Sequence, residues 1–410
     1  ISQRAKLKST YAINPNNGEM AVSAFLHLVD ENNLDGLEEN QVIINAQYGT
    51  ILSTSIPADN LTSVSQLPSV KYIEIGRPVH QRMNNVRSEQ FSNVNKIHEG
   101  TGLTQAYTGK DVIVGIIDGG FQYNHINFYD TEGKNLRIKR VWNQNQSGTP
   151  PTGYYYGTEY TNAEEIIAAK QDYAASHATH VTGIAAGAYK GNEYYGIAPD
   201  ADLVFVSYNV SDNSSSNTSI TDGIKYIYDY AESVGKPCVI NMSLGYHIGP
   251  HDGTSTFDRI CDELQGEGRL LVGASGNEAE YNIHATKTLK KGDTNMKSLV
   301  EFVSNWYLYG SMTSTVDIWG DAEKQLSARV FVYDILNKKE VYSSESFSTT
   351  TSTSKKISNP TGADGNIYIS TATNPYNKKG NITIDLNLSS FDNRNYYIGF
   401  EISGPEETTI

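Results

Sequence analysis

The stretch VIVGIIDGG, residues 112–120, decides the fold class of this chain. It is apolar on both faces as far as Asp118, which two glycines follow at once. Strands with two apolar faces belong to parallel sheets that helices cover on both sides. Ligands bind outside the carboxyl ends of such strands, so Asp118 is a candidate functional residue, although an aspartate that caps a turn would look the same.

Further apolar segments read as strands of the same sheet: 202–209, 238–244 and 269–276. Between them, residues 220–231 and 257–264 carry apolar side chains at helical spacing. Strands that alternate with amphipathic helices predict a doubly wound parallel α/β domain. We place this domain at residues 85–290.

The segments on either side of this domain differ from it. Two strand-like segments and a helical one within residues 21–75 predict a small α+β unit at residues 1–84, and a polar linker runs from 77 to about 110. After residue 290, short alternating segments are separated by Gly, Asn, Ser and Thr, a pattern typical of a β-sandwich or jelly roll. We assign residues 291–410 to this all-β unit.

Composition excludes several classes of protein. The 410 residues carry a formal net charge of -14 without a basic stripe, which argues against nucleic-acid binding. No apolar run approaches the roughly 20 residues that span a bilayer, and we expect the native N-terminus to precede Ile1. Cys238 opens a predicted buried strand and Cys261 lies on a core-facing helical stripe, so we expect two inert thiols rather than a disulfide framework or a zinc site.

Two later segments add candidate residues. SHATHVTGIAAG, residues 176–187, predicts a helix whose first turn carries His177. The helix dipole keeps an imidazole at this end neutral, which suits a general base, and a metal site with His180 lacks a third ligand nearby. GASGNEA, residues 273–279, ends a predicted strand and offers Asn277, whose amide can donate a hydrogen bond to an oxyanion.

Together and in this order, the motifs resemble those of the subtilisin-like serine proteases. The matching segments within residues 85–290 are VGIIDGG, HATHVTG, YGIAPDADL, VINMSLG and GASGN. The resemblance implies that Asp118 orients His177, that His177 takes a proton from a serine, and that Asn277 donates to the tetrahedral intermediate. It also implies a peptide or protein substrate that adds a strand to the sheet edge. The residues that would wall its pocket are Ser243, Leu244, Gly245, Ala274, Ser275 and Gly276.

The chain departs from the family pattern in three ways. Ala178 stands where the family nearly always has glycine. No Gly-Thr-Ser-Met-Ala-like helix start follows Asn277; we reject Ser255, in GTST, because it precedes Asn277 and suits a helix N-cap. The all-β block takes the place of that helix, as in the bacterial spore-germination proteases of the Csp type. We therefore expect the nucleophilic serine beyond Ile410.

By the same resemblance, residues 18–83 look like the family's prodomain, which inhibits its own protease with a tail that lies in the cleft. Self-cleavage would fall near Arg82 or Met83. The family also implies secretion or attachment to the bacterial cell envelope. The oligomeric state is not predicted.

No cofactor and no metal are expected. The family's usual calcium site takes a carboxylate nine residues beyond the catalytic Asp and an Asn-containing loop after the His helix. Here Asn127 stands at the first position, and the loop at 188–196 contains Lys190, which is unsuited to a cation site.

These inferences predict the precursor of a serine endopeptidase that acts through an acyl-enzyme and processes itself, with the present 410 residues inactive for lack of the serine helix. The alternative is a pseudoprotease that binds peptides or regulates, which Ala178 favours slightly. A third hypothesis, an adhesin or carbohydrate-binding protein, rests on residues 290–405 alone. Aromatic residues there could stack on sugars or fill a core: Trp306, Tyr307, Tyr309 and Trp319.

Overall fold

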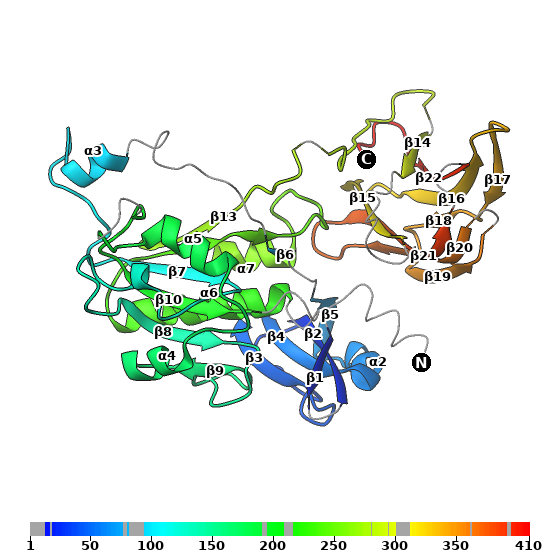
Figure 1. Cartoon of the computed structure of the whole chain (residues 1–410). Coiled ribbons are helices and arrows are strands. Elements are labelled where there is room, and N and C mark those ends of the chain that lie inside the picture. Colours follow the sequence, from blue (N-terminus) through cyan, green and yellow to red (C-terminus); the bar gives the residue numbers. More distant parts are fainter. Residues whose placement is uncertain are drawn as a thin grey trace. The chain divides into compact units, whose positions relative to one another are not determined.

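The computed structural model describes residues 13–16, 19–76, 80–81, 94–190, 195–208, 216–279, 281–293, 295–300, 312–360, 363–391 and 395–410. The chain divides into two compact units: unit 1 is Ile1–His247 with Thr256–Ala279, and unit 2 is Ile248–Ser255 with Glu280–Ile410. Figure 1 shows the elements of both. None of the helices in the described residues is both long and apolar enough to cross a membrane.

The N-terminal part of unit 1 is an antiparallel sheet in the order β1-β2-β4-β3, with β5 also paired to β2. Its strands are β1 (Ile13–Asn16), β2 (Glu19–Leu28), β3 (Ile43–Tyr48), β4 (Ile51–Pro57) and β5 (Val70–Ile75). The short helices η1 (Ala58–Asn60) and α2 (Leu61–Ser65) precede β5, and Val64 joins Leu26 and Leu52 in one core. The small α+β class is confirmed, but the β3–β4 hairpin was not predicted from the sequence.

The central sheet of unit 1 has the order β13-β11-β7-β10-β8-β9. All its neighbouring strands are parallel except the edge pair β8–β9. The strands are β7 (Ile113–Asp118), β8 (Ile138–Asn143), β9 (Thr158–Tyr160), β10 (Asp202–Ser207), β11 (Cys238–Met242) and β13 (Arg269–Gly273). Every residue of β7 is buried, as its two apolar faces predicted.

Helices cover both faces of this sheet. They are α4 (Ala163–Ala169), α5 (His177–Ala186), α6 (Asn217–Ser233) and α7 (Thr256–Leu264), and two short helices lie outside these layers, α3 (Val94–Glu99) and η2 (Ile126–Phe128). Ile117 of β7 faces α6 and packs with Val206 and Ile227, whereas its neighbour Ile116 shares the opposite core with Phe205. Successive residues of a strand point to opposite faces, so one apolar strand serves two cores. The predicted doubly wound fold is confirmed.

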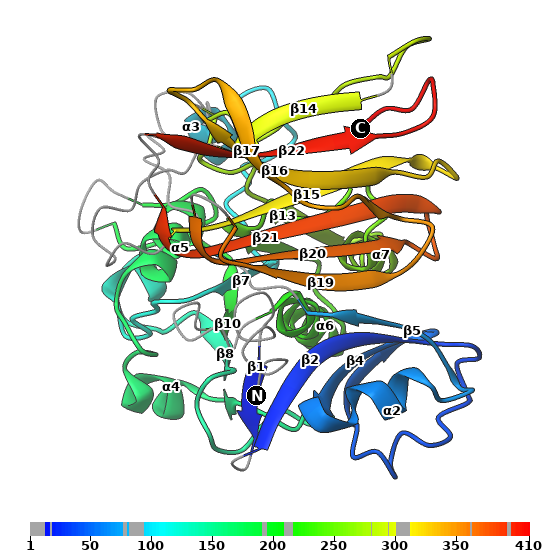
Figure 2. The same cartoon turned by 90° about the vertical axis from the view of Figure 1, so that its right-hand side faces the viewer.

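Unit 2 is a sandwich of two antiparallel sheets, β14-β22-β16-β17 with β18 on β16, and β15-β21-β20-β19 (Figure 2). Its strands are β14 (Asn295–Val300), β15 (Met312–Ala322), β16 (Ser327–Asp334), β17 (Lys339–Ser343), β18 (Phe347–Ser348), β19 (Thr353–Ser358), β20 (Ala363–Thr373), β21 (Lys379–Phe391) and β22 (Tyr396–Ser403). Alternate residues of both sheets, among them Ile384, Val330 and Ile398, share one core. The predicted all-β unit is confirmed.

Of the four aromatic residues considered for sugar stacking, the structure describes Trp319. Trp306, Tyr307 and Tyr309 lie outside the described residues. Trp319 is half-buried, and its indole N–H donates to Oδ2 of Asp317 at 2.8 Å. This bond ties the ring to the sandwich framework.

Phe205 of β10 is a core position where the loss of the side chain should lower stability. Its ring lies 4.5 Å from that of Phe121 and 5.4 Å from that of Phe128, between centroids, and its side chain is fully buried. Phe205→Ala should lower the free energy of unfolding by about 3–5 kcal/mol because a cavity replaces both ring contacts. Urea unfolding followed by circular dichroism measures the change. Tyr155→Ala, at a side chain that is 69% exposed, is the control; an equally small loss in both variants would contradict the prediction.

Candidate active site

Asp118 occupies the carboxyl end of the central strand β7 and is fully buried. The backbone N–H of Gly119 donates to its Oδ1 at 2.6 Å, and the N–H of Tyr208 donates to its carbonyl oxygen at 3.0 Å. Burial and the charge of Asp118 raise the pKa of Tyr208 well above its usual value, so this phenol is neutral beside the carboxylate.

His177 is the first residue of α5 and only 1% exposed. Its Nδ1 lies 2.7 Å from Oδ1 of Asp118. With the proton on Nδ1, the lone pair of the imidazole is on Nε2, which is the tautomer of a general base held by a carboxylate. The structure therefore brings together two of the residues that the motifs named.

Gly120 permits this close approach between β7 and α5. Its φ is +91°, and a Cβ here would lie 2.6 Å from Oγ of Ser176 and 3.1 Å from the backbone nitrogen of His177. Any other residue would push the start of α5 away from Asp118.

Ala178, the departure from the family pattern, is buried in the core beside the sheet. Its backbone N–H donates to the carbonyl oxygen of Gly119 at 3.0 Å. The methyl group therefore fits the interior without displacing His177 from Asp118.

Asn277 lies in the loop after β13 and is exposed. Its backbone N–H donates to Oε2 of Glu278 at 2.8 Å, and Nε2 of His247 lies 3.2 Å from the same oxygen. Because β11 alone separates β13 from β7 and all three are parallel, Asn277 and Asp118 lie at the same edge, with the strands about 10 Å apart. Asn277 and Asp118 therefore both lie where parallel strands of the sheet end.

The six residues predicted to wall a substrate pocket follow the neighbouring strands β11 and β13. Residues 243–245 continue from β11 and residues 274–276 from β13. The N–H of Ala274 donates to the carbonyl oxygen of Met242 at 3.1 Å, which keeps the two segments side by side beyond the sheet.

One of these segments already carries an added strand. Leu244 and Gly245 form β12, which pairs antiparallel with β6 (His80–Gln81), in the register Leu244↔Gln81 and Gly245↔His80. The chain N-terminal to the α/β domain therefore binds the edge where the resemblance places a substrate. The predicted cleavage positions, Arg82 and Met83, lie outside the described residues.

The N-terminal sheet also packs on α7. Ile260 shares a core with Phe25 and Ile51, and the hydroxyl of Thr256 bonds to the carboxylate of Glu74. Helix α7 begins at Thr256, so Ser255 directly before it is at the N-cap position of this helix.

Asp222 of α6 lies where the N-terminal sheet packs on helix α6. Its carboxylate is fully buried and accepts from the hydroxyl of Tyr48 at 3.1 Å, across the interface, and from that of Tyr156 at 2.9 Å. Burial raises the pKa of Asp222 to about 6, against the hydrogen bonds from Ser53, Tyr156 and Tyr48, which lower it.

The residues near the expected calcium position do not fit that ion. Four backbone carbonyl oxygens accept from the buried guanidinium of Arg137: those of Tyr129 at 2.9 Å, Ala201 at 2.8 Å, Asn127 at 3.0 Å, and Ala186. A fixed cation thus already satisfies oxygens of the kind that calcium would bind. Lys190 lies nearby in sequence with Nζ 5.4 Å from the ring centroid of Tyr195, while residues 191–194 of the loop are outside the described ranges.

Within the described part of the chain, no group of three or more His, Cys, Asp or Glu side chains could hold a metal ion. His180, the rival metal ligand, is exposed. Burial raises the pKa of both Cys238 and Cys261 to about 12, so both are protonated thiols of low reactivity near neutral pH.

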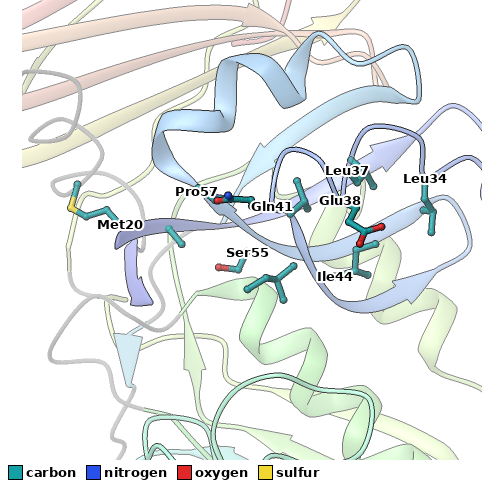
Figure 3. Close-up of a pocket in the computed structure, with 11 residues that line it drawn as sticks. Met20, Leu34, Leu37, Glu38, Gln41, Ile44, Ser55 and Pro57 are labelled. Carbon is teal, nitrogen blue, oxygen red and sulfur yellow. The ribbon is translucent and has the colours of Figure 1, made fainter. Parts of the chain in front are cut away.

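A pocket of about 530 Å³ lies in the N-terminal sheet and not at the candidate site (Figure 3). Its lining is mainly apolar, with Glu38 and Gln41 among the side chains. None of the site residues predicted from the sequence lines this pocket.

Two buried charged residues, Arg137 and Asp222, were not predicted from the sequence. Each is a single polar residue without a motif. Only its partners in space, which come from other segments, distinguish it from a surface residue.

The fold is α/β, with a buried Asp–His pair where the central strand β7 ends. Comparison with known proteins identifies the family. Residues 109–397 match the subtilase family, peptidase S8. A subtilisin of Bacillus sp. (strain TA39) is 28% identical over 46% of this chain and 39% of its own length. Subtilisin E of Bacillus subtilis (strain 168) is 26% identical over 58% of this chain and 52% of its own.

Among solved structures, that of the Clostridium perfringens CspB protease superposes with a TM-score of 0.60 at 19% identity, over 78% of this chain and 66% of that one. This likeness shows the fold. The chain belongs to the subtilase family. It spans about half the length, or less, of the subtilisins that it matches.

Calcium should not stabilise this protein, because the guanidinium of Arg137 already occupies the carbonyl oxygens. We expect the melting temperature to be the same in millimolar calcium and in excess chelator. Arg137→Met should instead lower the free energy of unfolding by about 3 kcal/mol or more, since it leaves buried carbonyls without donors. Scanning calorimetry measures both. A rise of several degrees with calcium in the unchanged chain would refute the prediction.

Proposed function

We propose that this chain is part of a serine endopeptidase that cleaves peptide bonds through an acyl-enzyme. The observation that carries the proposal is the buried bond of 2.7 Å between Nδ1 of His177 and Oδ1 of Asp118. Family membership supports the same class of reaction.

In the proposed reaction, Nε2 of His177 takes the proton from a serine hydroxyl while its oxygen attacks the scissile carbonyl carbon. The carbonyl electrons move to oxygen, and the side-chain amide of Asn277 donates to the oxyanion. Asp118 stabilises the imidazolium, which then protonates the leaving amine. Water releases the acyl group in the reverse sequence with the same residues.

The N-terminal region acts, in this proposal, as an intramolecular inhibitor that the protease later removes. Two observations support it: β6 occupies β12 as a substrate strand would, and the N-terminal sheet packs on α6 and α7. Cleavage near Arg82 or Met83 would release β6 from the edge.

The serine is expected in a segment that follows Ile410, so residues 1–410 alone are proposed to be inactive. Strand β13 supports this view, because it is the edge of the described sheet although its sequence is that of an interior strand. Leu270 and Val272 are 55% and 50% exposed. Secretion or attachment to the cell envelope is proposed from the family.

Turnover should depend on the Asp118–His177 pair. In the protein encoded by the complete gene, His177→Ala or Asp118→Asn should lower kcat by about 10⁴-fold or more, because the serine then lacks its base or the base its correct tautomer. Hydrolysis of a chromogenic peptide, with and without a serine-directed phosphonate, measures the loss.

His180→Ala is the matched control, since this histidine lies one turn further along α5 and is exposed. It should keep full activity. Full activity in His177→Ala would end the proposal. A complete protein without turnover that still binds peptides at residues 243–245 would instead identify the pseudoprotease.

Docking of the N-terminal region should weaken as the pH rises through the pKa of Asp222. Its pKa is raised from 3.8 to about 6, so the docked state binds the proton more tightly. This stabilisation is present below about pH 4 and is lost as the pH passes 6. The ionisable groups that face the carboxylate are Tyr48, Tyr154 and Tyr156, which are neutral throughout this range.

Asp222→Asn removes this titration. The free energy of unfolding of Asp222→Asn minus that of the unchanged chain should therefore increase by about 2 kcal/mol from about pH 4.5 to about pH 7.5. Urea unfolding at both pH values measures it. His27, whose pKa burial lowers to about 3, titrates in the opposite sense, and the comparison of the two chains cancels it. A pH-independent difference between the chains would contradict the prediction.

A further inference from the structure

Two segments carry the Asp118–His177 pair: the end of β7 with the residues that follow it, 118–122, and the start of α5. Backbone hydrogen bonds join them, from the N–H of Ser176 to the carbonyl oxygen of Gly120 at 2.9 Å and from the N–H of Ala178 to that of Gly119 at 3.0 Å. These bonds use the carbonyl groups of the two glycines. The N–H of Gly120 needs another acceptor.

Asp172 supplies that acceptor. Its Oδ2 accepts from the N–H of Gly120 at 2.9 Å and from the hydroxyl of Ser207 at 2.5 Å, while its Oδ1 accepts from the N–H of Ala174 at 3.1 Å. The N–H of Asp172 donates to the carbonyl oxygen of Phe121 at 3.1 Å. A single carboxylate therefore joins the segment after β7, the end of β10 and the segment that leads into α5.

The three donors belong to segments that lie next to Asp118 or His177 in the sheet or along the chain. Ser207 is the partner of Asp118 in the parallel β7–β10 ladder, and Gly120 is two residues after it. Ala174 is three residues before His177 on the chain. Asp172 thus fixes both the strand beside Asp118 and the segment that delivers the imidazole.

An aspartate suits this position better than its amide. Both oxygens accept, and two donors meet on one of them. Asparagine would offer one oxygen and one NH₂ group, so the amide hydrogens would face the donor of Ala174, Gly120 or Ser207. Hydrogen bonds to a charged acceptor are also about twice as strong as those to a neutral one.

We propose that Asp172 is a positioning residue of the active site, which holds His177 at hydrogen-bonding distance from Asp118 by joining the three segments that carry them. The proposal rests on the catalytic role proposed for this pair. Asp172 does not touch the reacting atoms in this scheme; it acts through the position of the other two residues.

The test uses residues 1–410 and needs no turnover. The proton shared by Nδ1 of His177 and Asp118 should give a far-downfield proton resonance, and loss of the resonance in His177→Ala assigns it. In Asp172→Asn we expect this resonance to move upfield or to broaden through faster exchange with water. In the complete protein, kcat should fall by about 10²-fold with KM little changed, as for a misplacement of about 1 Å.

Asp130→Asn is the matched control. Asp130 is likewise a loop carboxylate with several donors, among them the N–H groups of Glu132 at 3.1 Å and Lys134 at 2.8 Å, but it lies in an exposed turn before β8. It should lower stability without moving the resonance. If Asp172→Asn changes only stability, as the control does, the proposal is wrong.

Ser207→Ala removes one donor and serves if Asp172→Asn does not fold. It should shift the same resonance in the same direction by a smaller amount, and an unchanged resonance would overturn the proposal. The two proposals fail separately. An inactive complete protein with the expected resonance shifts would reject the protease while keeping Asp172 as the residue that positions the pair.

Discussion

The architecture of the candidate site depends on one bond, between Nδ1 of His177 and Oδ1 of Asp118. Both side chains are almost wholly removed from water, and a buried carboxylate without partners would cost several kcal/mol. The hydrogen bond with His177 and the one from the N–H of Gly119 together offset the free-energy cost of burying the carboxylate. The bond with His177 can form only if α5 approaches the carboxyl end of β7 closely, and the conformation of Gly120 permits that approach.

The same principle recurs elsewhere in unit 1: charged groups that sequence alone would place on the surface are buried where segments meet. Arg137 donates to carbonyl oxygens of four residues, and Asp222 accepts from tyrosines of two regions. Each makes its burial tolerable by several directed hydrogen bonds. Such groups stabilise one arrangement of the segments over looser ones, because any displacement leaves them unsatisfied.

The sequence predicted the interior of the fold better than its edges. Apolar runs predicted β7, β10, β11 and β13. In β7 and β10 almost every residue is buried, whereas Leu270 and Val272 of β13 are exposed. The β3–β4 hairpin and β8 were missed. In β4 the residues STS at 53–55 are polar although Ser53 and Thr54 are fully buried, and β8 carries Lys139 and Arg140 between apolar residues. Their pairing depends on neighbouring strands that a local pattern does not reveal.

By itself, the sequence determined the family motifs, the two-faced strand that ends at Asp118, the helix that begins at His177, and the alternation of the all-β unit. These are local features, set by periodicity, glycine placement and the end of a strand or helix. Only the tertiary structure decided which distant groups meet: β6 on β12, Tyr48 on Asp222, and Asp172 between three segments. The physical reason is that a hydrogen bond depends on distance and direction in space, and chain order constrains neither once residues are far apart.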